Sequence, residues 1–165
     1  MTASRSVGRS CQLCSVHPIR ELAESRPEHP SDLDFGPVTE SSVREVEDTL
    51  GAQLPNEFRD YLLTFAGGLL LGWEIYGVPT PQSKPPATLV DSILEIVEQN
   101  RTIQNPQGVI EFANDGGGFF FAFIPPRDPN AVFVRGYGTD WTLLYPSFHD
   151  FLHAIADGSI SYPRC

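Results

Sequence analysis

The stretch TESSVREVEDTLGAQLPNEFRDYLLTFAGG, residues 39–68, decides the first part of the fold. Its apolar residues recur every three or four positions in each half, and this spacing predicts two amphipathic helices. A short segment from a glycine to a proline, residues 51–55, separates the halves and predicts a tight connection. The chain is therefore expected to begin its folded part with a helical pair.

Residues at the ends of both predicted helices fit their positions. Thr39 is a good N-cap, because its hydroxyl can accept a hydrogen bond from a free backbone N–H. Gly51 follows the last apolar position of the first helix, where a left-handed residue is favoured. Pro55 is expected in the first turn of the second helix, and Gly67 and Gly68 are expected to end it.

Length and charge bound the class of protein. The chain has 165 residues and is 41% hydrophobic, which fits one folded domain with a tail. Its formal net charge is −10, of which residues 38–165 carry −9. An acidic domain repels phosphate backbones, so nucleic acid is not an expected partner. A basic protein would be attracted instead, although acidity that serves only solubility is an open alternative.

Targeting, membrane and metal signals are weak in this sequence. The N-terminus has no apolar run, and no stretch has the roughly 18 apolar residues of a spanning helix, so we expect a cytoplasmic protein without membrane contact. Cys11, Cys14 and Cys165 are an odd number for a disulfide scaffold. The spacing from Cys11 and Cys14 through His17 to His29 matches no standard zinc finger, so no metal or cofactor is expected.

The remaining elements predict an α+β domain. Residues 1–37 form an N-terminal extension that we expect to be loosely attached or partly disordered, and residues 38–165 form the domain. Strands joined by short turns predict a mainly antiparallel sheet of about 4–6 strands with helices packed on one side, two of them N-terminal and one C-terminal. The expected elements after the helical pair are a strand or bent strand pair at 69–78, a helix at 89–101, strands at 108–115, 116–124, 131–138 and 141–145, and a helix at 146–158.

Two patterns resemble catalytic motifs, but neither predicts a catalytic site. His149 and His153 have the spacing of a zinc protease helix, yet Asp150 stands where the catalytic glutamate would be and no third ligand is evident. A solvated face is the favoured interpretation. The glycine-rich turn at residues 114–118 precedes a strand rather than a helix, so it predicts a hairpin and not a phosphate loop. No catalytic residue is expected.

Acidic and aromatic residues are the candidates for partner binding. Acidic side chains on the first helix would attract a basic partner, and aromatic residues are enriched at interaction hot spots. Burial is the favoured alternative for Trp73, whereas Trp141 follows a turn and is expected to be half exposed. The candidate partner-binding residues are Glu45, Glu47, Asp48, Trp73, Tyr76, Asp140 and Trp141.

Three segments together carry a resemblance to a known family. The helical pair, then FANDGGGFFFAF (residues 112–123), then YPSFHDFL (residues 145–152) resemble, in this order, the SUKH superfamily over residues 38–157. That group includes a yeast cell-wall assembly regulator and many bacterial immunity proteins. Two departures stand out: residues 1–37 lie outside the resemblance, and FFFAFI is unusually apolar, as a buried central strand or a distinct partner surface would be.

The resemblance implies an α+β domain without known catalytic residues. Its bacterial members bind and neutralise toxins, often nucleases, of polymorphic toxin systems. The first hypothesis is therefore a non-enzymatic immunity protein whose acidic surface binds a basic toxin domain. The alternative is a regulatory or scaffold adaptor, as the eukaryotic members suggest.

Overall fold

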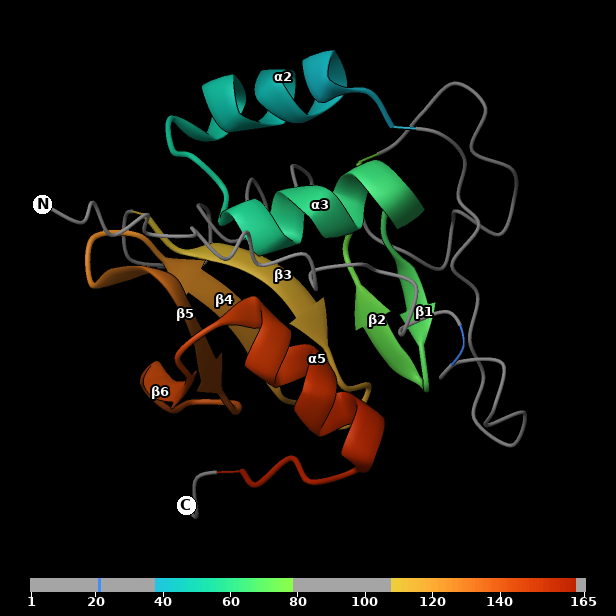
Figure 1. Ribbon diagram of the computed structural model, residues 1–165. Helices are drawn as coiled ribbons and strands as arrows, with labels where there is room; N and C mark the ends of the chain where they lie inside the picture. Colours follow the sequence, from blue (N-terminus) through green and yellow to red (C-terminus); the bar gives the residue numbers. More distant parts are fainter. Residues whose placement is uncertain (1–20, 22–37, 79–107, 163–165) are drawn as a thin grey trace, which may run out of the picture.

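The computed structural model describes residues 21, 38–78 and 108–162, and in these it is an α+β fold. Six strands form one antiparallel sheet in the order of the sequence. Two helices precede the strands and one follows them (Figure 1), as predicted. The elements are α2 (Glu40–Leu50), α3 (Asn56–Phe65), β1 (Gly68–Leu70), β2 (Trp73–Ile75), β3 (Ile110–Asn114), β4 (Phe120–Ile124), β5 (Asp128–Arg135), β6 (Thr142–Tyr145) and α5 (Phe148–Asp157).

The caps of α2 form as predicted. The Thr39 hydroxyl accepts a hydrogen bond from the backbone N–H of Ser42 at 3.2 Å, and Gly51 adopts a left-handed conformation with φ of 67°. Val43 and Val46 form the buried side of this helix. Their burial orients α2 against α3, outside the helix layer that covers the sheet (Figure 1).

The end of α3 differs from the prediction. Ala66, rather than a glycine, takes the left-handed position with φ of 63°, and Pro55 is the N-cap rather than a first-turn residue. Gly67 and Gly77 are needed for another reason, because their backbones cross at close range. A side chain on Gly77 would place its Cβ 1.9 Å from the carbonyl oxygen of Ala66. This crossing sets the path from α3 into β1 and β2.

An aromatic cluster joins α3 and α5 to the sheet. The Phe58 ring lies 5.3 Å from Phe112 of β3, 5.2 Å from Phe123 of β4 and 5.0 Å from Phe148 of α5, measured between ring centroids. Phe151 of α5 adds a further edge contact to Phe112. Because the cluster draws on both helices and two central strands, it fixes the helix layer on this face of the sheet.

β4 is a central strand that is apolar on both faces. It lies between β3 and β5. Phe121 and Phe123 face the main core, whereas Ala122 and Ile124 belong to a second apolar cluster with Phe133 on the other face. The uniform apolar composition of FFFAFI is thus explained by burial of a central strand, the first of the two alternatives above.

Some predicted segments lie outside the described residues. They are the N-terminal extension at 1–37 except residue 21, with Cys11 and Cys14, the helix at 89–101, and Cys165. Of the helices that the structure describes, none combines the length and hydropathy that crossing a bilayer requires.

Tyr61 of α3 is expected to weaken the fold at high pH. Its hydroxyl is buried and makes no hydrogen bond within the described residues. Burial raises the pKa of Tyr61, whereas tyrosine in an unfolded chain ionises near pH 10. Only the unfolded chain then loses this proton above about pH 10, so the stability linked to it is complete below that pH and decreases above it.

Replacing Tyr61 with phenylalanine is therefore expected to increase the free energy of unfolding by about 1 kcal/mol at pH 8, because it removes a buried hydroxyl that has no hydrogen-bond partner in the part of the chain that the structure describes. The decrease above pH 10 should also become shallower. Urea unfolding at pH 8 and pH 10.5 measures both effects. Tyr137→Phe is the control, since Tyr137 is 80% exposed. A destabilised Tyr61→Phe protein would mean that the hydroxyl has a partner.

Candidate partner-binding surface

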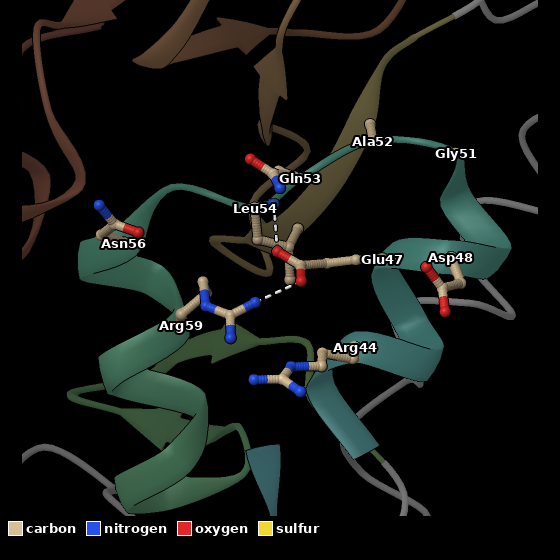
Figure 2. Close-up of a pocket in the computed structure, with 9 residues that line it drawn as sticks. All are labelled: Arg44, Glu47, Asp48, Gly51, Ala52, Gln53, Leu54, Asn56 and Arg59. Carbon is tan, nitrogen blue, oxygen red and sulfur yellow. Dashed lines mark hydrogen bonds and ion pairs between the residues drawn. The ribbon is translucent and has the colours of Figure 1, made fainter. Parts of the chain in front are cut away.

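A polar groove separates the C-terminal half of α2 from the start of α3 (Figure 2). It has a volume of about 670 Å3. Its lining comprises Arg44, Glu47, Asp48, Gly51, Ala52, Gln53, Leu54, Asn56 and Arg59. The groove thus lies at the helical pair that the sequence marked first, and it includes two of the candidate residues.

Glu47 holds the two helices together across this groove. Its Oε1 accepts a hydrogen bond from the backbone N–H of Leu54 at 2.8 Å, and its Oε2 accepts one from Nη1 of Arg59 (Figure 2). Nη2 of Arg59 also pairs with Glu40 at 2.6 Å. The hydrogen bond that Arg59 donates to Glu47 raises the pKa of the Arg59 guanidinium above its ordinary value. With 11% of its side chain exposed, Glu47 mainly serves the fold.

Glu45 and Asp48 have the opposite character. Both side chains are exposed on α2, and Arg44 beside them is exposed as well. No hydrogen bond or ion pair of the Glu45 or Asp48 carboxylates occurs within the described part of the chain. These two carboxylates are therefore available to a partner, whereas that of Glu47 is engaged.

Trp73 and Tyr76 pack into the fold. The Trp73 ring lies 5.2 Å from Phe121 and 5.9 Å from Phe151, and it remains partly exposed. Tyr76 is 2% exposed. Its hydroxyl accepts a hydrogen bond from Asn114 Nδ2 at 3.1 Å. Both aromatic side chains thus have structural contacts, and Trp73 alone has surface to offer.

Asp140 and Trp141 lie between β5 and β6. Asp140 is exposed. Trp141 is only 7% exposed, so the expected half exposure is wrong. The Arg135 guanidinium lies 4.7 Å from the centroid of the Trp141 ring. The backbone carbonyl of Trp141 accepts a hydrogen bond from Arg127 Nη1 at 3.1 Å. The prediction rested only on the turn before Trp141. That turn gave no indication that arginines from β5 and from the loop before β5 would cover the tryptophan.

The seven candidate residues do not form one patch. Three of the four acidic ones lie on α2, outside the helix layer, and Asp140 lies between β5 and β6, whereas the aromatic ones lie in or beside the sheet (Figure 1). β2 and β6 are four strand intervals apart, which is roughly 19 Å at about 4.8 Å per interval. A single small interface therefore cannot centre on both Trp73 and Trp141.

A comparison with known protein families shows to which family the chain belongs. Residues 37–154 match the SMI1/KNR4 family (SUKH-1). The chain belongs to this family. A search of curated proteins found no match. The SUKH-1 family is known for immunity proteins, and its members are generally non-catalytic immunity or regulatory proteins.

The turn after β3 in this SUKH-1 domain has a role that the sequence did not indicate. One oxygen of Asp115 accepts backbone hydrogen bonds from Gly117 at 2.8 Å and Phe119 at 3.0 Å, and the other accepts one from the Tyr162 hydroxyl at 2.8 Å. The Tyr162 ring stacks on Phe119. Burial, together with Asp115, raises the pKa of Tyr162. Asp115 thus fastens the segment after α5 to the sheet, and no pattern around Tyr162 predicted this.

Catalytic features are sparse in the described part of the SUKH-1 domain. Across residues 38–78 and 108–162, no group of three or more His, Cys, Asp or Glu side chains is placed to hold a metal ion. Among these residues, Glu111 carries a buried carboxylate, and it accepts hydrogen bonds from Tyr76 and Arg135, both at 3.4 Å. On α2, the side chains of Glu45 and Asp48 are exposed at the surface of the domain.

Proposed function

We propose that this SUKH-1 protein is a non-enzymatic protein-binding domain that acts as an immunity protein, binding and neutralising a toxin of a bacterial polymorphic toxin system. The observation that carries the proposal is the family match over residues 37–154. The net charge of −10 supports a basic partner. A nuclease toxin fits this description, because its own substrate is polyanionic and selects a basic surface.

The proposal places partner contacts on the exposed side of α2. Glu45 and Asp48 are three residues apart on one helix, so their side chains project from the same side. Neither is engaged within the described fold, which leaves their charges free to steer a basic partner. Asp140 is exposed in the same way at the far end of the sheet, and it is the weaker candidate because the tryptophan beside it is buried.

A regulatory or scaffold adaptor is the second candidate function. The family includes regulatory proteins, and a protein-binding surface would serve such a role equally well. The two candidates differ in their consequence for the partner: an immunity protein abolishes the activity of its toxin at one equivalent, whereas an adaptor leaves its partner active.

The decisive experiment uses the purified protein as bait and then as inhibitor. Bound chains are captured from the native cell extract and identified. Toxin domains encoded beside the gene are added to the extract, because an unexpressed toxin would otherwise be missed. A captured toxin is then titrated with the protein. Complete loss of toxin activity at one equivalent supports immunity, whereas capture of active signalling proteins alone supports the adaptor.

Reversing the charges of Glu45 and Asp48 to lysine is expected to slow association with a basic partner by about tenfold at low salt and less at high salt. The dissociation rate should change less, since exposed charges act mainly on the encounter. Stopped-flow or surface-based kinetics at two salt concentrations measure this.

A matched control separates the local surface from net charge. Asp60→Lys with Asp157→Lys makes the same change in net charge at exposed positions of α3 and α5. If both double variants slow association equally, the effect is global and α2 is not the contact surface. Glu47 is left unchanged in both, because reversing it would disturb Arg59 and the backbone of Leu54.

A further inference from the structure

Two imidazoles face each other on the exposed side of α5. His149 and His153 are one helical turn apart, and both are exposed. Their Nε2 atoms are 2.9 Å apart, with ring centroids at 4.4 Å and ring planes at 78°. Without a bound ion, this contact is a hydrogen bond in which one Nε2 carries the proton and the other accepts it.

The backbone that carries this pair is fixed from two sides. The hydroxyl of Ser147 caps α5 by accepting a hydrogen bond from the N–H of Asp150 at 3.1 Å. Glu57 reaches from α3 and accepts a hydrogen bond from the N–H of His149 at 2.9 Å. Phe148 and Phe151 anchor the opposite side of the helix in the core. The helix backbone beneath the two imidazoles is therefore held in place.

We propose that His149 and His153 chelate one divalent transition-metal ion through their two Nε2 atoms. Imidazole nitrogens bind such ions at about 2.0–2.1 Å. With the Nε2 atoms at their present separation, the angle between the two bonds at the metal would be roughly 90°. This angle belongs to neighbouring positions of a square-planar or octahedral ion, so copper(II) and nickel(II) fit better than tetrahedral zinc.

Binding needs no net change of protonation in the pair. The ring that donates through Nε2–H shifts to the tautomer protonated at Nδ1, which frees the second lone pair for the metal. Water fills the remaining coordination positions. The sequence argued against a metal because a protease site requires a third ligand and a glutamate base. A chelate without catalytic function requires neither.

Metal titration of the full-length protein tests the proposal. Its three cysteines are changed to serine so that no thiol competes, and the protein is treated with a chelator and titrated with Cu²⁺, Ni²⁺ or Zn²⁺ alone by calorimetry. We expect saturation at one equivalent, tightest for Cu²⁺. Electron paramagnetic resonance of the copper complex should show coupling to two imidazole nitrogens.

Single-residue variants decide between this site and others. His149→Ala and His153→Ala are each expected to weaken Cu²⁺ binding at least about tenfold, since even the loss of a group that supports a ligand costs that much. Asp157 lies one turn further along the exposed side, and Asp157→Asn should change the affinity for Cu²⁺ by no more than about twofold. Three results would each overturn the two-imidazole site. They are the absence of saturable Cu²⁺ binding, alanine variants that bind Cu²⁺ as tightly as the unchanged protein, and an Asp157→Asn variant that loses as much affinity as the alanine variants. Unchanged circular dichroism confirms that the variants fold.

Discussion

Replacing Phe58 with alanine is expected to lower the free energy of unfolding by about 3–5 kcal/mol. Phe58 is fully buried, and its ring contacts four other aromatic rings drawn from two helices and two strands. Alanine would leave a cavity where both helices meet the sheet, and rigid neighbouring rings collapse poorly into such a space. Because domains of this size are stable by about 5–15 kcal/mol, the change removes a large part of the total.

Urea denaturation followed by far-ultraviolet circular dichroism measures this loss, and the melting temperature should fall by roughly 10 °C or more. Leu143→Ala is the matched control. Leu143 is 60% exposed on β6, so its truncation should change the free energy of unfolding by less than about 0.5 kcal/mol. A Phe58→Ala loss below about 1 kcal/mol would contradict the central place of this ring.

Replacing Glu47 with alanine is expected to cost about 2–3 kcal/mol of stability. The change removes a carboxylate that accepts hydrogen bonds from both Leu54 N–H and Arg59. The Leu54 N–H then lacks this acceptor, and the partly buried Arg59 guanidinium lacks this partner. Glu47→Gln keeps an acceptor for Leu54 and should cost less. Glu45→Ala, on the exposed side of the same helix, should change stability by less than about 0.5 kcal/mol.

A double-mutant cycle tests whether the effect arises from this contact. The losses for Glu47→Ala and Arg59→Ala, measured by urea unfolding, should sum to more than the loss in the double variant by at least about 0.5 kcal/mol. Additive losses would instead mean that Glu47 acts through the backbone of Leu54 alone.

Local sequence signals predicted the helices and strands, because caps and short turns depend on residues that are close together in the sequence. The Thr39 cap and the left-handed Gly51 follow from single residues, and the antiparallel order follows from short turns between apolar runs. The glycines after α3 were harder, because Gly67 is required by a chain crossing with Gly77, ten positions away. The domain boundary near residue 37 stays a prediction.

The surface was less predictable than the fold. Periodicity places Glu47 with the exposed carboxylates of α2, yet its side chain turns toward Arg59 twelve positions later. Trp141 is covered by Arg135, and Tyr162 reaches Asp115 across 47 positions. Each of these contacts depends on how distant elements come together, which residue spacing along a single element does not encode. The residues left exposed are therefore known only once the fold is assembled.

The way α2 is attached to the domain has a consequence for the evolution of its specificity. Of its eleven residues, Val43 and Val46 are buried, and Glu47 and Glu40 provide the polar links to α3. Substitutions at most other positions leave these four attachments intact and carry little penalty in folding. A lineage under pressure from a changing partner could thus alter α2 one position at a time, without compensating mutations in the core.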